Sequence, residues 1–230
     1  MSDNSMILAI ETSTKNCSVA LGKSGMLIVE KEQGGDYSHA ENLAVFVNEI
    51  LEENGYNLQA IDAIAVGKGP GSYTGLRIGV SYAKGLCLAL RIPLIGVNSL
   101  TSLAYGAFKE IPKEALAAPM IDARRMEVYC AIYDKDLNVI KKVSADIIDK
   151  DSYNELLSKH QIYFLGNGSD KCKATLIHPN AFFLDEKDTS AKFLLTLAED
   201  KYQKKDFEDI AYFEPFYLKE FVAAKPSRML

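Results

Sequence analysis

Short apolar runs separated by polar turns open the chain. Residues 6–10 are apolar and are followed by Glu-Thr-Ser-Thr, which predicts a buried strand with polar groups at its end. Residues 17–21 and 26–30 form two more apolar runs, and Gly-Lys-Ser-Gly at 22–25 supplies the turn between them. Three successive strands joined by short connections predict a β-meander.

The apolar spacing then changes from that of a strand to that of a helix. Ser38 is a candidate N-cap, with Glu41 three residues later as in a capping box. Four apolar residues follow at helical spacing: Leu43, Val47, Ile50 and Leu51. Together they predict a helix that ends at the Asn-Gly pair of residues 54 and 55.

A glycine-rich stretch lies between the next strand and the next helix. Residues 61–66 form a compact apolar strand, and residues 67–75 form a loop with the sequence Gly-Lys-Gly-Pro-Gly-Ser-Tyr-Thr-Gly. Residues 76–90 predict a helix that is apolar over much of its circumference and is therefore buried on more than one side. Residues 93–97 and 99–108 predict a further strand and helix.

The second half of the chain starts in the same way as the first. Residues 119–133 contain an apolar strand that ends in Asp122, then a polar turn and a second strand, as the first strands do around Glu11. This weak internal repeat predicts an α/β fold with two related lobes. We expect residues 1–98 to form the first lobe and residues 99–230 a second, smaller one.

Composition and charge narrow the classes of function. The chain has 230 residues, of which 48% are hydrophobic, so it can bury a substantial core. Its net charge of -5 argues against a protein that grips a nucleic-acid backbone by itself, so we expect any contact with RNA to be indirect. The first apolar run breaks at Glu11 and has no basic residues before it, which predicts a cytoplasmic protein with no membrane segment.

The cysteines and histidines predict no metal site. Four cysteines lie far apart without a Cys-x-x-Cys pair, and we expect them to be reduced and packed as small apolar residues: Cys17, Cys87, Cys130 and Cys172. The three histidines are also widely separated: His39, His160 and His178. No motif of a complete active site is present in the chain.

The glycine-rich loop and the first strand end are the candidates for nucleotide binding. The loop lacks the Gly-Lys-Ser/Thr ending of a P-loop, because Leu76 and Arg77 follow its last glycine. A tight turn with close helix packing is therefore favoured over phosphate binding, and polar residues at a strand end more often cap the next turn. Weak nucleotide binding remains open for six residues: Glu11, Thr12, Ser13, Gly69, Gly71 and Asp122.

Several segments, in this order, resemble the TsaB/TsaD family of tRNA threonylcarbamoyladenosine biosynthesis. In the first half these segments are residues 7–14, 69–79, 83–85 and 92–98. In the second half residues 121–129, 164–168 and 214–219 are similar to TsaB rather than to TsaD. The resemblance implies the actin-like ATPase/sugar-kinase fold, with two related lobes that each contain a mixed sheet.

The resemblance also implies a role without catalysis. TsaD carries a metal-binding His-x-x-x-His whose positions here are Ser99 and Leu103, and neither residue is a suitable ligand. We therefore expect a scaffold or activator subunit that binds TsaD, and through it TsaE, with no cofactor of its own and no metal. The alternatives are a nucleotide-dependent, kinase-like enzyme and, less favoured, a protease.

The family pairs through helices of the first lobe, as a homodimer or with TsaD, which implies partner-binding roles for residues 38–53 and 76–90. The partner-binding candidates are Ala40, Leu43, Phe46, Val47, Tyr82 and Leu86. The alternative is that the same apolar residues face the sheet of their own lobe. The sequence does not decide which face of each helix is exposed.

Overall fold

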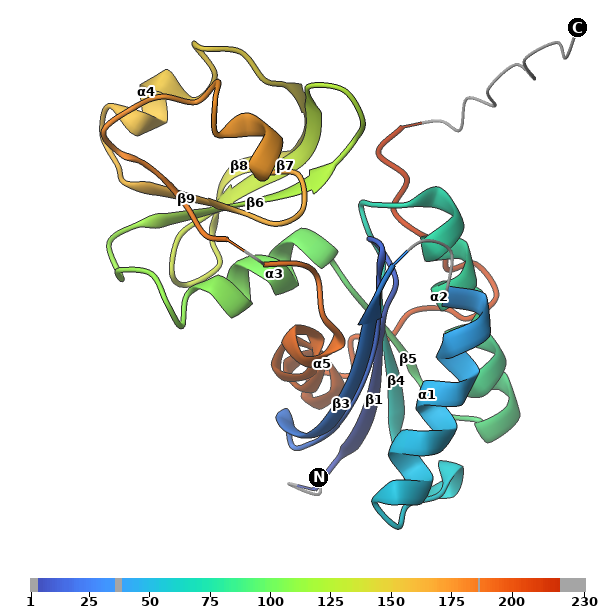
Figure 1. Ribbon diagram of the computed structural model, residues 1–230. Helices are drawn as coiled ribbons and strands as arrows, with labels where there is room; N and C mark the ends of the chain where they lie inside the picture. The colour runs from blue at the N-terminus through green and yellow to red at the C-terminus, as the bar shows by residue number, and fades with distance from the viewer. Residues whose placement is uncertain (1–3, 36–38, 186, 220–230) are drawn as a thin grey trace, which may run out of the picture.

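Two lobes, each built on a five-stranded mixed sheet, make up the computed structural model, which describes residues 4–35, 39–185 and 187–219 (Figure 1). The first sheet has the order β3-β2-β1-β4-β5. Its strands are β1 (Met6–Glu11), β2 (Asn16–Lys23), β3 (Met26–Gly34), β4 (Ala63–Gly67) and β5 (Leu94–Val97). Strands β1 to β3 form the predicted meander, and β1, β4 and β5 run parallel to one another.

Helices cover both faces of the first sheet. α1 (His39–Glu53) and α2 (Tyr73–Leu90) pack side by side on one face, and α5 (Leu194–Gln203) packs on the other (Figure 1). The alternation of β1 explains this arrangement, because Leu8 and Ile10 point toward α1 and α2 while Ile7 points toward α5. The central strand is thus apolar on both sides, as a sheet covered on both faces requires.

The second sheet repeats the first in strand order and direction. Its order is β8-β7-β6-β9-β10, with the first two pairs antiparallel and the last two parallel. Its strands are β6 (Leu116–Asp122), β7 (Glu127–Tyr133), β8 (Val139–Ile147), β9 (Ile162–Leu165) and β10 (Ala181–Phe183). The predicted internal repeat and the two-lobed α/β fold are therefore confirmed.

The connections of the second lobe are shorter than those of the first. α4 (Asn154–Leu157) lies between β8 and β9, where the first lobe has α1. The single turn η2 (Asp170–Cys172) lies between β9 and β10, where the first lobe has α2, and its Cys172 belongs to the core of the second lobe. α3 (Ser99–Ala107) follows β5 and packs against β6 and β7 on the opposite face of the second sheet.

The chain returns to the first lobe after β10. The turn η3 (Ala191–Phe193) and α5 pack on the first sheet, and Glu208 pairs with Leu94 at the free edge of β5. The division at residue 98 stays a prediction. It corresponds to the division between the two sheets, but α5 and the segment after it lie against the first sheet, because their apolar residues fill its second face and its edge.

The elements differ from the predicted ranges at a few ends. α2 begins at Tyr73, three residues before the predicted start, because the Ser72 hydroxyl accepts a hydrogen bond from the amide of Gly75 (3.2 Å) and caps the helix. The predicted cap at Ser38 lies outside the described residues. All four cysteines are buried and unpaired, as predicted. None of the described helices combines the length and apolar character that a membrane crossing needs.

Candidate functional site

The polar end of β1 is buried. The side chains of Glu11, Thr12 and Ser13 have no exposed surface, and the Glu11 carboxylate accepts a hydrogen bond from the amide of Ser13 (2.8 Å). Burial raises the pKa of Glu11, and hydrogen bonds from Ser13 and Ser99 offset part of that rise. A carboxyl group in this setting is held by its own lobe rather than presented to solvent.

The glycine-rich loop packs directly on this strand end. The Thr12 hydroxyl donates to the carbonyl of Gly75 (2.8 Å), and the amide of Ser72 donates to the carbonyl of Ser13 (2.6 Å). A Cβ atom on Gly71 would lie 2.2 Å from the Ser13 oxygen, closer than any real contact. The glycines are therefore required for close packing of loop, helix and strand.

Several amides of the loop are already used inside the protein. The amide of Gly69 donates to the Ser99 hydroxyl (3.3 Å), that of Ser72 to Ser13, and that of Gly75 to the Ser72 hydroxyl. A phosphate-binding loop needs such amides to point at the ligand. The structure thus brings together Glu11, Thr12, Ser13, Gly69 and Gly71, in an arrangement that favours the structural interpretation of the glycines.

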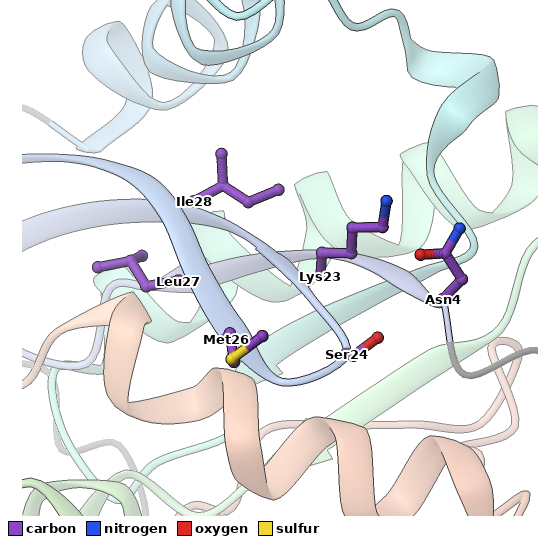
Figure 2. A pocket seen from close by; sticks show the side chains of 6 residues that line it. All are labelled: Asn4, Lys23, Ser24, Met26, Leu27 and Ile28. Carbon is purple, nitrogen blue, oxygen red and sulfur yellow. The ribbon is translucent and has the colours of Figure 1, made fainter.

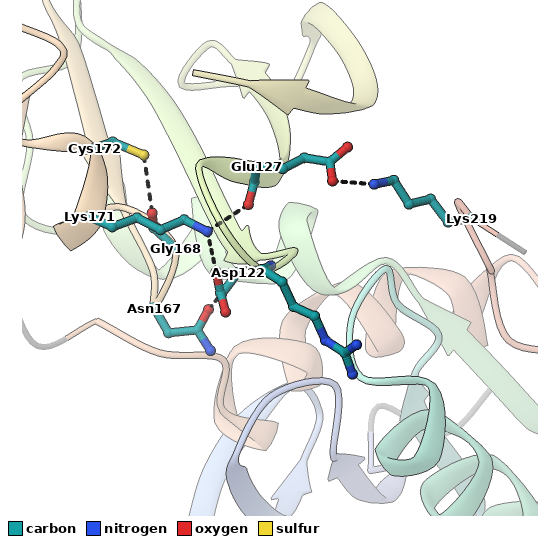
Figure 3. A network of polar contacts seen from close by, with 8 residues as sticks. Asp122, Glu127, Asn167, Gly168, Lys171, Cys172 and Lys219 are labelled. Carbon is teal, nitrogen blue, oxygen red and sulfur yellow. Dashed lines mark hydrogen bonds and ion pairs between the residues drawn. The ribbon is translucent and has the colours of Figure 1, made fainter. Parts of the chain in front are cut away.

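Asp122 ends β6 just as Glu11 ends β1, but its surroundings differ. It is exposed, forms an ion pair with Lys171, and accepts a hydrogen bond from the amide of Arg124 (3.2 Å). Its own amide donates to the side chain of Asn167 (3.0 Å), as Figure 3 shows. Among the described contacts none links Asp122 to Glu11, so the structure does not assemble the six candidates into one site.

A second polar cluster, which the sequence does not predict, joins the β1–β2 turn and β3 to residues 188–190. The hydroxyls of Thr14 and Thr189 lie 3.0 Å apart, and the Ser190 hydroxyl donates to Glu32 (2.9 Å). Burial raises the pKa of Asp188 in the same segment. The only signal in the sequence is the run Asp-Thr-Ser before a helix, which resembles an ordinary helix cap.

The partner-binding candidates divide into buried and accessible residues. Leu43 and Val47 are 2% and 1% exposed and belong to the core with β1, so they face the sheet of their own lobe, and their contact with a partner stays a prediction. The reason is the helical period, which directs both residues at the sheet. Ala40 is exposed, and the other three are half-buried: Phe46, Tyr82 and Leu86.

The structure also reveals exposed apolar residues that the sequence does not single out. Val45 on α1 is 48% exposed, and Leu88 on α2 is 67% exposed. Small residues surround them on the outer sides of the two helices, at Ala44, Ser81, Gly85 and Ala89. We call this set the helical face of the first lobe. A surface of small and apolar residues allows close approach of another protein.

The remaining features of the described residues are a surface depression and scattered ionisable side chains. A shallow depression of about 410 Å³ lies at the outer edge of β3, and its lining holds one ionisable residue (Figure 2). It is lined by Asn4, Lys23, Ser24, Met26, Leu27 and Ile28. Across the described residues, no group of three or more His, Cys, Asp or Glu side chains could hold a metal ion.

The two lobes have the same strand order, and the first strand of each sheet ends in a carboxylate. A glycine-rich loop lies beside the carboxylate of the first lobe. These features define an actin-like ATPase/sugar-kinase fold. A family model described as TsaD, tRNA N6-adenosine threonylcarbamoyltransferase, matches residues 34–225. The tRNA threonylcarbamoyladenosine biosynthesis protein TsaB of Haemophilus influenzae is 31% identical in an alignment that covers 96% of this chain and 97% of that protein. The chain belongs to the TsaB family.

Further comparisons agree with this assignment. TsaB of Escherichia coli is 42% identical over 134 residues, which span 58% of this chain and 57% of that protein. The solved structure of YeaZ from Pseudomonas aeruginosa superposes with a TM-score of 0.81 at 30% identity, and the match covers 93% of this chain and all of that one (100%). Both lobes are therefore included in the structural match.

Proposed function

We propose that this chain is a non-catalytic scaffold subunit in threonylcarbamoyl transfer to the tRNA adenosine next to the anticodon. In this role it binds TsaD, and through TsaD also TsaE. The observation that carries the proposal is which residues α3 has at the positions of the TsaD metal ligands. Where TsaD has its two metal-binding histidines this chain has Ser99 and Leu103, which are 0% and 1% exposed and pack inside the protein.

The strand end and its loop support the same role. A kinase-like enzyme, the alternative, needs Glu11 or Asp122 beside a magnesium-bound nucleotide. Here Glu11 is buried against glycine backbone, and Asp122 is paired with Lys171. We propose that the chain needs no cofactor and that any nucleotide binding is weak. A direct binding measurement with ATP and magnesium tests this part on its own.

The helical face of the first lobe is the proposed partner surface. All its members are exposed: Ala44 and Val45 on α1, and Ser81, Gly85, Leu88 and Ala89 on α2. The exposed Ala40 lies one turn before Ala44 on α1. We propose that it pairs with TsaD and, when TsaD is absent, with a second copy of this chain. We propose that it works in the cytoplasm, together with the tRNA that the transferase modifies.

Reconstitution of the reaction tests the role. Threonylcarbamoyladenosine formation on tRNA is measured with TsaD, TsaE, the adenylate-forming enzyme, ATP, threonine and bicarbonate, with and without this chain. We expect product only when both this chain and TsaD are present. Full activity without this chain contradicts the scaffold role, and product formed without TsaD contradicts the assignment as non-catalytic.

A further inference from the structure

The hairpin between β6 and β7 has an unusual tip. Arg124 and Arg125 are both exposed, and their φ angles are 70° and 49°. The tip is closed by hydrogen bonds from the amide of Ala123 to the carbonyl of Glu127 (3.0 Å) and from the amide of Glu127 to the carbonyl of Arg124 (3.1 Å). Positive φ angles favour glycine or asparagine, so two consecutive arginines are costly for the fold.

The acidic residues beside this tip are already neutralised. Lys171 pairs with Asp122 and donates to the carbonyl of Glu127 (2.7 Å), and Lys219 pairs with the Glu127 carboxylate, as Figure 3 shows. In the part of the chain that the structure describes, no ion pair engages Arg124 or Arg125. The hairpin tip therefore presents two guanidinium groups whose charge is not compensated nearby.

The segment after α5 connects the hairpin to the start of α2, which carries an aromatic ring and a third arginine. Tyr217 packs on Tyr73 with 4.9 Å between ring centres, and the Arg77 guanidinium lies 4.4 Å from the centre of the Tyr73 ring. Lys219, which pairs with the hairpin, is only two residues from Tyr217, a separation of at most about 7 Å. Arg77 and the hairpin tip thus lie on either side of one short segment.

We infer that this hairpin surface binds the phosphate backbone of RNA. We define it by six residues: Tyr73, Arg77, Arg124, Arg125, Tyr217 and Lys219. Guanidinium groups match phosphate oxygens with paired donors, and interleaved aromatic rings are typical of surfaces that hold unpaired bases. The net charge of the chain does not oppose this, since binding depends on the local cluster. The choice of RNA over an acidic protein rests on the proposed function.

The test is tRNA binding by the assembly of this chain with TsaD, measured by fluorescence anisotropy at several salt concentrations. We expect R124Q/R125Q to weaken binding at least tenfold. The slope of log K against log salt should become less negative by about 1 to 2, since each lost phosphate contact contributes about 0.9. The charge-matched control is K113Q/K142Q.

Lys113 and Lys142 are suitable control positions because both are exposed and neither belongs to the hairpin tip. Lys113 precedes β6, whose seven residues separate it from the hairpin tip by about 20 Å. The control should therefore bind tRNA within about twofold of the native assembly. A third variant, R124G/R125G, removes both charges and places glycine at the two positive φ angles. It should therefore lose RNA affinity without a lower unfolding temperature.

The outcomes separate the two proposals. Unchanged affinity and salt slope in R124Q/R125Q would overturn the RNA site. Loss of TsaD pairing in that variant would also overturn it, and would make the hairpin a protein contact. If the native chain fails to pair with TsaD, the proposed function fails instead. The same variants are then compared with the native chain alone at low salt, where weaker binding supports the RNA site and equal binding overturns it.

Discussion

Glu11 is a carboxyl residue that the fold removes from water. Its carboxyl is fully buried, and burial raises its pKa above the ordinary value of 4.5. The folded chain therefore binds this proton more tightly than the unfolded chain does. The free energy of unfolding should fall as the pH rises above about 4.5, and this decrease should end at the pKa of the folded state.

A conservative substitution tests this consequence. In Glu11→Gln the side chain can still accept the hydrogen bond from Ser13, but it has no charge to bury. We expect a flatter dependence of the unfolding free energy on pH above 4.5, with equal or greater stability at neutral pH. Urea unfolding at a series of pH values measures it. The exposed Glu114→Gln is the control, and an unchanged slope in Glu11→Gln would contradict the assignment.

At the scale of the element, α2 offers a matched pair of glycines. A Cβ on Gly79 would lie 2.2 Å from the Thr12 hydroxyl oxygen, whereas a Cβ on Gly85 would meet nothing within 4 Å. Gly79→Ala should lose roughly 1–3 kcal/mol of stability, because the packed strand end has no room for it. Gly85→Ala should gain up to about 1 kcal/mol, because alanine favours the helix. Thermal or denaturant unfolding distinguishes the two, and equal effects would contradict the packing argument.

The elements show how far the sequence could predict this fold. The apolar runs located most of the strands, because a strand buried on both faces is apolar at nearly every position, as β1 is. The motifs also identified the family and the strand end beside the glycine loop. They could not show that the amides of the loop form hydrogen bonds within the protein. Ser13 and Ser99 accept these bonds, and they come next to the loop only when the sheet is folded.

The second feature that the sequence could not predict is which residues of α1 are exposed. The sequence identifies Leu43 and Val47 as part of an apolar stripe. However, a stripe that faces the sheet and a stripe that faces a partner have the same helical period. Only the position of β1 decides between them, and it buries both residues. The exposed Val45 lies off the stripe, so no pattern marked it.

At the scale of the whole molecule, the helical face should control assembly. Val45→Glu with Leu88→Glu places two charges on exposed positions, so the fold should persist while affinity for TsaD falls at least about tenfold. Leu43→Ala is the contrasting variant, because it should lower stability by roughly 2–5 kcal/mol. Sedimentation with and without TsaD measures pairing. Normal pairing of the double variant would place the interface elsewhere.

The two sheets share one plan, but only one lobe carries long helices. In the positions of α1 and α2 the second lobe has a helix of 4 residues, α4, and a turn of 3 residues, η2. Among the described residues, only the first lobe therefore carries an extended face made of two long helices. A face that pairs with its own copy, or with a related face, across a twofold axis is covered completely by one neighbour. If the helical face is the partner surface proposed above, its valence is one, so assembly through it closes at two subunits and cannot grow into a filament.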